Sequence, residues 1–119
     1  MADHNIFGAE GEWLAKAYLE GKEYEILDQN WRFKKAEIDL IAYKDSRLIF
    51  VEVKTRREGS FAQPEDFVNH QKRKLMALAA EEYIHRIGHQ YEVRFDIISI
   101  LFNTFDKPTI KHIEDAFWP

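Results

Sequence analysis

An acidic and a basic residue interrupt the most apolar run in the first half of the chain. The segment LIFVEVK, residues 48–54, is typical of a buried strand except at Glu52 and Lys54. Side chains two residues apart on a strand point to the same face. A carboxylate and an ammonium group therefore share one face, a combination that can bind a metal ion and stabilise negative charge on a phosphate.

A second carboxylate, Asp39, lies in the alternating run EIDLIAY, residues 37–43, which predicts another strand. The polar residues 44–47 predict a four-residue turn, so residues 37–55 are expected to form a hairpin. A turn centred on Asp45 and Ser46 places Asp39 opposite Glu52. Their Cβ atoms would then be ~5 Å apart.

Two carboxylates at that separation repel each other unless a cation neutralises them. Hard oxygen ligands favour Mg²⁺ or Mn²⁺. We expect Asp39, Glu52 and the backbone carbonyl of Val53 to be the metal ligands. Lys54 would then stand beside the metal, where it orients or deprotonates a water or stabilises charge on a phosphate. The pattern predicts a phosphodiester-hydrolysing site.

The simpler alternative is an ion pair between Glu52 and Lys54 on a half-exposed strand. The Glu-x-Lys tripeptide is common, so alone it carries little information. Asp39 weighs against this alternative, because the hairpin would otherwise set two like charges opposite each other at a cost in free energy.

The elements that must position these residues are expected in the order helix, three strands, helix, strand. The helix between the third and fourth strands allows a parallel crossover, which predicts a mixed α/β sheet that is antiparallel in its first half. The tail TIKHIEDAFWP is expected to add a short edge strand. The other expected elements are helices at residues 8–21 and from Pro64 to about Ile87, and strands at residues 24–33, 37–43, 48–55 and 91–102.

Composition limits the class of protein. The 119 residues hold no visible repeat or linker, which predicts a single domain over residues 1–119. The net charge of -4 excludes a strongly basic coat, so nucleic-acid binding would need a local basic patch. Without cysteine there is neither a disulfide scaffold nor a Cys-based zinc site. The N-terminus lacks signal-peptide features and no apolar run approaches the ~20 residues of a membrane span, which predicts a soluble cytoplasmic protein with no membrane partner.

Four segments in order, GEWLAKAYL, EIDLIA, FVEVKTR and VRFDIISI, resemble the YraN-like family of small bacterial proteins. That family is placed in the PD-(D/E)xK nuclease superfamily, near the Holliday-junction-resolvase-like members. The resemblance covers nearly the whole chain and includes the spacing D-x12-E-x-K. It implies a restriction-endonuclease-like αβββαβ core, a mixed sheet flanked by helices, with Asp39, Glu52 and Lys54 as catalytic residues. It also implies that a first-helix glutamate, Glu12, completes the site.

The chain departs from the family pattern in two places. Ala36 stands where the family has glycine before Glu-Ile-Asp, and Lys72 and Arg73 stand where it tends to carry Lys-Gln. Periodicity of the first helix leaves two apolar arcs open, one that includes Glu10 and one with Glu12 at its edge. The resemblance selects Glu12.

Basic residues near the carboxylates suggest the partner. Arg56 and Arg57 directly follow the site, and Lys72 and Arg73 come early in the second helix, so we expect these four side chains to contact nucleic-acid phosphates. No base-reading helix is evident, which favours structure-selective binding. The resulting hypothesis is a metal-dependent endonuclease acting on DNA, in a branched or damaged form, and compatible with a homodimer.

Two alternatives stay open. The first is a nucleic-acid-binding module that has the nuclease fold but little catalysis, and the second is a structural or protein-interaction domain. Among other residues, Asp96 is expected to have a structural role that supports Lys54 or a helix end. His112 is expected at the surface and Trp13 in the core.

Overall fold

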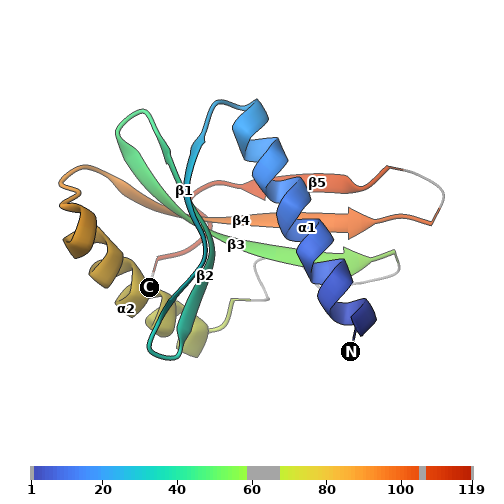
Figure 1. Cartoon of the computed structure of the whole chain (residues 1–119), viewed down its shortest axis with the longest axis horizontal. Coiled ribbons are helices and arrows are strands. Elements are labelled where there is room, and N and C mark those ends of the chain that lie inside the picture. The colour runs from blue at the N-terminus through green and yellow to red at the C-terminus, as the bar shows by residue number, and fades with distance from the viewer. Residues whose placement is uncertain (1, 59–67, 105–106, 119) are drawn as a thin grey trace.

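The computed structural model describes residues 2–58, 68–104 and 107–118. Within these ranges the chain forms two helices and five strands, in the expected order and with the expected edge strand at the end (Figure 1). The elements are α1 (Ala2–Gly21), β1 (Glu25–Phe33), β2 (Ala36–Lys44), β3 (Arg47–Arg57), α2 (His70–Ile87), β4 (Val93–Phe102) and β5 (Thr109–Ile113).

The five strands form one sheet in the order β1-β2-β3-β4-β5. Strands β3 and β4 are parallel and are connected through α2, whereas the other neighbouring pairs are antiparallel. The predicted mixed α/β sheet is therefore confirmed. Among the described residues, neither helix is long and apolar enough to cross a lipid bilayer.

The two helices cover opposite faces of the sheet. Ala15 and Leu19 of α1 pack on one core cluster together with Val51, while Met76 of α2 packs on the other together with Phe50. In Figure 1, α1 crosses in front of β3 and β4 and α2 lies at the lower left, away from it. Successive residues of β3 therefore belong alternately to the α1 face and the α2 face.

The β2–β3 hairpin has a tighter turn than expected. Its strands extend to the pair Lys44–Arg47, which leaves only Asp45 and Ser46 as the loop. Both loop residues have positive φ angles, 53° and 64°. This is the type I′ arrangement whose twist matches that of the flanking strands. The predicted hairpin is confirmed, but its loop has two residues instead of four.

The first helix approaches the sheet through small residues. Gly11, Ala15 and Leu19 are four residues apart and form its buried stripe. A Cβ atom at Gly11 would lie 1.8 Å from Cγ2 of Thr55, so the helix backbone contacts β3 directly. Trp13 lies off this stripe and is 66% exposed, which makes its predicted core position wrong.

Helix α2 begins at His70, and the predicted start at Pro64 lies outside the described part of the chain. Asn69 is the N-cap, and its side chain accepts a hydrogen bond from the backbone N–H of Lys72. Val68 is buried before the helix starts. The predicted end at Gly88 is confirmed by a left-handed C-cap with φ 70°. The following strand begins at Val93, two residues later than expected.

Asp96 of β4 is fully buried and belongs to a polar network on the α1 face. Its carboxylate accepts hydrogen bonds from Arg94 Nε (2.9 Å) and the backbone N–H of Asp115 (3.0 Å), and it lies 2.7 Å from His112 Nε2. Burial raises the pKa of Asp96, but these hydrogen bonds outweigh it and lower the pKa overall. These contacts give Asp96 a structural role at β5. The side chain of His112 is only 6% exposed, so its predicted surface position is wrong.

Candidate active site

The two predicted carboxylates lie where β2 and β3 separate. The pairs Tyr43–Leu48 and Leu40–Val51 confirm the predicted register, and Leu40–Val51 is the last pair of the ladder. Beyond it, Oδ2 of Asp39 accepts a hydrogen bond from the backbone N–H of Val53 at 2.8 Å. The side-chain carboxylate of Asp39 thus replaces the backbone carbonyl that would accept this hydrogen bond in a regular sheet. The hydrogen bond holds Asp39 against β3 beside Glu52.

Strand β2 changes its orientation at Asp39. Ile38 packs in the core cluster on the α2 face, whereas Leu40 packs in the cluster on the α1 face. In a regular strand these two side chains would share a face. The break in alternation leaves Asp39 half-buried at the edge of the core. Such a position supplies both a rigid backbone and access to solvent.

Glu52 is 3% exposed and interacts with two lysines. Its Oε1 atom forms an ion pair with Nζ of Lys72, from the first turn of α2, and lies 3.4 Å from Nζ of Lys54. Glu52 is two residues from Phe50 of the α2-face cluster and therefore points to the same face, which explains why a lysine from α2 reaches it. The predicted proximity of Glu52 and Lys54 is confirmed.

Ionisation of the site is strongly perturbed. Burial, together with the neighbouring Glu52 carboxylate, raises the pKa of Asp39 to about 8. Burial lowers the pKa of Lys54. Burial also acts to lower the pKa of Lys72, but its ion pair with Glu52 outweighs this and raises the pKa. Perturbed carboxyl and ammonium groups at the wall of a cleft are typical of functional sites.

The structure distinguishes the two glutamates of the first helix. Glu10 is exposed, whereas Glu12 is half-buried beside the close contact of Gly11 with β3. Burial raises the pKa of Glu12; a hydrogen bond with Asn30 opposes this, and the nearby charges of Glu37 and Glu52 add to it. Glu12 is therefore close enough to Asp39 and Glu52 to interact with them electrostatically, and its catalytic role stays a prediction.

The four residues predicted to bind nucleic acid occupy two places. Arg56 and Arg57 lie at the end of β3, beyond Lys54. Lys72 and Arg73 lie in the first turn of α2. Arg73 donates a hydrogen bond to the carbonyl of Val68 at 3.1 Å, and its guanidinium lies 5.4 Å from the ring centroid of Phe117. Contact of these four residues with nucleic acid stays a prediction.

Sequence reasoning missed the ion pair between Lys72 and Glu52. The residues are 20 positions apart in sequence and are joined through residues 59–67, which lie outside the described part of the chain. Lys72 was expected only as a phosphate contact, because a charged residue in the first turn of a helix carries no local signal for a particular partner. The resemblance to a pattern with lysine at this place was the one available indication.

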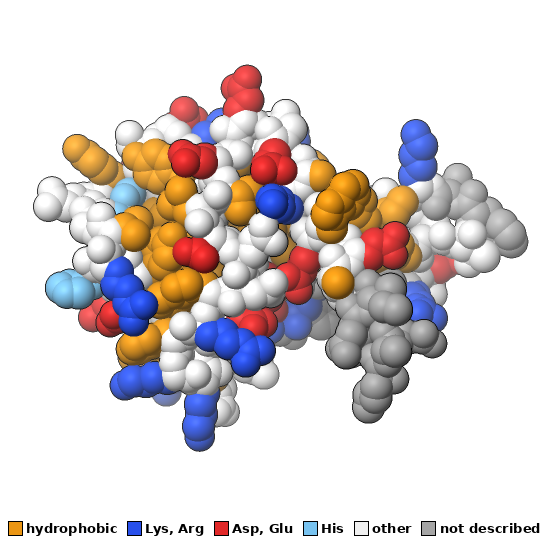
Figure 2. All heavy atoms as spheres, in the orientation of Figure 1, with side chains coloured by type: hydrophobic (Ala, Val, Ile, Leu, Met, Phe, Trp, Pro, Cys, Tyr) orange, Lys and Arg blue, Asp and Glu red, His pale blue; other side chains and the backbone are white. Residues whose placement is uncertain are grey.

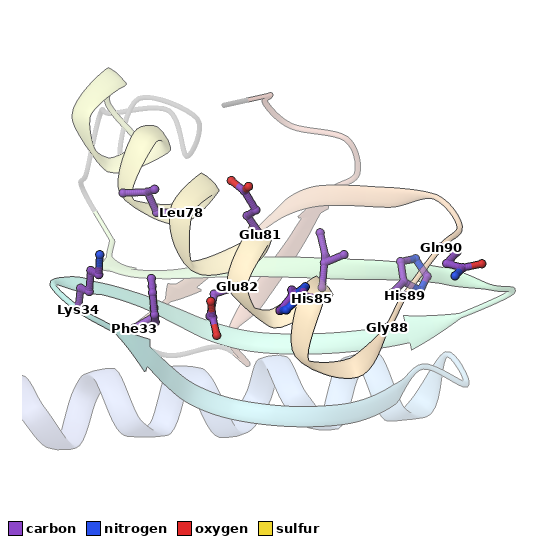
Figure 3. A pocket seen from close by; sticks show the side chains of 10 residues that line it. Phe33, Lys34, Leu78, Glu81, Glu82, His85, Gly88, His89 and Gln90 are labelled. Carbon is purple, nitrogen blue, oxygen red and sulfur yellow. The ribbon is translucent and has the colours of Figure 1, made fainter.

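A cleft of about 410 Å³ opens beside the carboxylates, between the β1–β2 turn and the start of α2; Asp39, Glu52, Gln71 and Lys72 are among its lining residues. A larger cleft of about 640 Å³ lies further along α2. Figure 3 shows Phe33 and Lys34 facing α2 across that larger cleft, with Glu82 and His85 nearby. The smaller cleft holds the paired carboxylates and is the better candidate for chemistry.

The oxygen-rich donor set suits a hard divalent cation. Across the described ranges, no three histidine, aspartate or glutamate side chains converge into a ready metal site. Magnesium is nevertheless often held by one or two carboxylates together with waters. Among the described residues, Asp39 uses Oδ2 for the Val53 N–H and Glu52 uses Oε1 for Lys72, so Oδ1 and Oε2 are the oxygens that could bind a metal. The raised pKa of Asp39 is also typical of carboxylates that lack a sufficient counter-charge. The residues present therefore fit Mg²⁺ or Mn²⁺.

Taken together, the mixed five-stranded sheet, its two helices and the carboxylates on β2 and β3 define an α/β domain with a restriction-endonuclease-like core. Comparison with known proteins agrees with this. The model of the "Uncharacterised protein family UPF0102" matches residues 11–100, and the chain belongs to this family. The family is the YraN-like one and is PD-(D/E)xK nuclease-like, which confirms the resemblance seen in the sequence.

The relatives span nearly the whole chain. A UPF0102 protein of Flavobacterium psychrophilum is 45% identical over 118 residues, which cover 99% of this chain and 98% of the relative. One of Bacteroides fragilis is 44% identical, covering 100% of this chain and 98% of the relative. One of Rhodococcus jostii is 42% identical, covering 98% of this chain and 100% of the relative. The similarity therefore extends over nearly the full length of this chain and of each relative.

Proposed function

We propose that this protein is a metal-dependent endonuclease that acts on DNA in a branched or damaged form. The observation that carries the proposal is that Asp39 and Glu52 line one cleft and that Lys54 lies beside Glu52. Asp39 is tied to β3 through Val53, and Lys54 lies 3.4 Å from Glu52. Both carboxylates and the lysine are therefore held by sheet backbone, which positions reactive groups accurately.

Each residue has a distinct role in this proposal. Asp39, Glu52 and the carbonyl of Val53 would hold Mg²⁺ or Mn²⁺, which supplies an activated water and neutralises charge on the phosphate. Lys54 orients or deprotonates the attacking water, or stabilises the negative charge that builds up in the transition state. Its lowered pKa favours the proton-accepting role. Glu12, near the pair, completes the site by orienting a water.

Nucleic-acid binding would rest on a local patch. Figure 2 shows acidic and basic side chains interspersed over the face that carries α1. With a net charge of -4, phosphate contacts are expected chiefly from Arg56, Arg57, Lys72 and Arg73. Contacts to phosphates fix position without reading bases, which favours recognition of DNA shape. If the substrate is DNA, we expect the protein in the cytoplasm. A homodimer could contact two arms of a branched DNA at once.

A binding module with this fold but little catalysis is the second candidate. Glu52 already interacts with two lysines, and the described side chains form no three-residue metal cluster. If the lysines satisfy the carboxylates permanently, the cleft holds no metal and the fold serves only to bind nucleic acid. The two candidates differ in whether a divalent cation binds.

Titration calorimetry with Mn²⁺ tests the proposal. The wild-type protein should bind Mn²⁺, and both Asp39→Ala and Glu52→Ala should lower the affinity at least tenfold, about 1.4 kcal/mol. Glu81→Ala, an exposed carboxylate of α2, is the matched control and should bind as the wild type does. Cleavage is then assayed with Mn²⁺ on duplex, flap, single-stranded and four-way-junction DNA. Mn²⁺ binding that does not depend on either carboxylate would exclude the metal site, and metal binding without cleavage of any DNA would favour the binding module.

A further inference from the structure

The ion pair of Lys72 with Glu52 places an ammonium group beside the carboxylate pair that would hold a metal. Lys72 is the third residue of α2, and its backbone N–H is fixed by a 2.9 Å hydrogen bond to Oδ1 of Asn69. Its side chain crosses to β3 and reaches a carboxylate that is 3% exposed. Lys72 also lines the cleft that holds Asp39. The described structure therefore contains an internal cation at the carboxylate pair.

The position of Lys72 in the first turn of α2 is unfavourable with respect to the helix dipole. Positive side chains are unfavourable near the N-terminus of a helix, where the backbone N–H groups already carry partial positive charge. The first turn of α2 contains no acidic residue that would compensate. Glu52 is the group that offsets this cost for Lys72. When a metal ion neutralises Glu52 in place of Lys72, the N-terminus of α2 is expected to attract an anion.

We propose that Lys72 is a resident cation, that it leaves Glu52 when a divalent metal binds, and that the released ammonium group then contacts a phosphate of the nucleic acid. The inference rests on the metal site of the proposed function. With a divalent cation between Asp39 and Glu52, the ammonium groups of Lys54 and Lys72 would be in excess of the two carboxylate charges. A phosphate beside the first turn of α2 would offset the charge of the released Lys72. The flexible four-carbon stem of lysine allows the movement.

Metal affinity tests the first half of this proposal. Lys72→Met keeps much of the apolar stem and removes the competing charge, so the affinity for Mn²⁺ in calorimetry should rise at least tenfold. Lys72→Arg keeps the competing charge and should bind Mn²⁺ no more tightly than the wild type. Lys74→Met removes an exposed lysine of the same helix and is the matched control, with an expected change below twofold. An unchanged affinity in Lys72→Met would overturn the proposal and leave the metal site in place.

Nucleic-acid affinity tests the second half. The measurements use a fluorescein-labelled four-way junction and the Lys54→Met background, in which cleavage is expected to be slow. Mn²⁺ should strengthen junction binding in Lys54→Met, because it releases Lys72 for a phosphate. In Lys54→Met/Lys72→Met this strengthening should fall at least threefold. Equal strengthening in both proteins would overturn the phosphate contact.

Failure of this inference can be distinguished from failure of the proposed function. If the wild type does not bind Mn²⁺ but Lys72→Met does, the competing role of Lys72 is supported. If both bind equally well, the metal site stands and the inference is wrong. If neither binds Mn²⁺, while circular dichroism shows that both are folded, the metal site and the inference are both wrong.

Discussion

The carboxylate of Asp39 accepts the backbone N–H of Val53 across the point where their strands separate, at 2.8 Å. This one contact joins β2 to β3 after their ladder has ended at Leu40–Val51. It also fixes Asp39 next to Glu52, so two acidic groups are held together in a partly buried place. The site thus combines an ordinary hairpin with a local electrostatic conflict that a cation would relieve.

Asp39→Asn should change the dependence of stability on pH. The raised pKa of Asp39, about 8, means that the folded state binds more protons than the unfolded state between about pH 4 and pH 8. The free energy of unfolding of the wild type therefore decreases as the pH rises through this window. Asparagine does not titrate and can still accept the Val53 N–H. Its stability relative to the wild type should increase from about pH 5 to about pH 8.5, measured by urea unfolding in EDTA. A stability difference independent of pH would show that Asp39 titrates normally.

Lys54→Met should reduce catalysis more than binding. Its Nζ atom lies 3.4 Å from Oε1 of Glu52, and the side chain is 29% exposed. Methionine keeps much of the stem and removes the charge that would act in the transition state. We expect Mn²⁺ affinity at least as high as in the wild type, and cleavage of branched or single-stranded DNA reduced about 100-fold, about 2.7 kcal/mol. The control Lys74→Met should cleave normally. Equal cleavage by Lys54→Met would make Lys54 a structural residue.

Arg56 and Arg57 should determine much of the salt dependence of DNA binding. They extend β3 just beyond Glu52 and Lys54, where the phosphates next to a cleavage point would lie if the proposed function is right. Each phosphate contact with duplex DNA contributes about 0.9 to the slope of log affinity against log salt. The variant Arg56→Ala/Arg57→Ala should therefore flatten the slope by up to about 2, measured by fluorescence anisotropy. Arg86→Ala, near the far end of α2, is the control. An unchanged slope in the double variant would move the binding surface elsewhere.

Two glycines of α1 should respond in opposite directions to alanine. Nothing lies within 4 Å of a Cβ at Gly8, so Gly8→Ala should stabilise the protein by up to about 1 kcal/mol through helix propensity. A Cβ at Gly11 would lie 1.8 Å from Thr55 Cγ2, so Gly11→Ala should cost about 1–3 kcal/mol. The second change Thr55→Ser removes that methyl group and should recover part of the loss. Urea unfolding of all four proteins measures this; similar effects at both glycines would mean that α1 does not pack closely on β3.

Local sequence patterns were sufficient to predict much of the fold. The order of the elements follows from where periodicity changes and where turn residues interrupt it. The register of the β2–β3 hairpin follows from its short loop, because a tight turn fixes the pairing of the strands it connects. The proximity of Glu52 and Lys54 follows from strand alternation alone. These features depend on residues that are close in sequence.

The tertiary structure decided where side chains of distant elements meet. Periodicity could not choose between Glu10 and Glu12, and the close contact of Gly11 with Thr55 makes that choice. Trp13 is exposed and the His112 side chain is buried, because docking of α1 and β5 determines which face each residue presents. Lys72 meets Glu52 only because α2 packs over β3. The sequence determined the elements, the register and the chemical types available at the site. Helix docking and the break in alternation at Asp39 determined which charges lie together, because such contacts join residues that no local period relates.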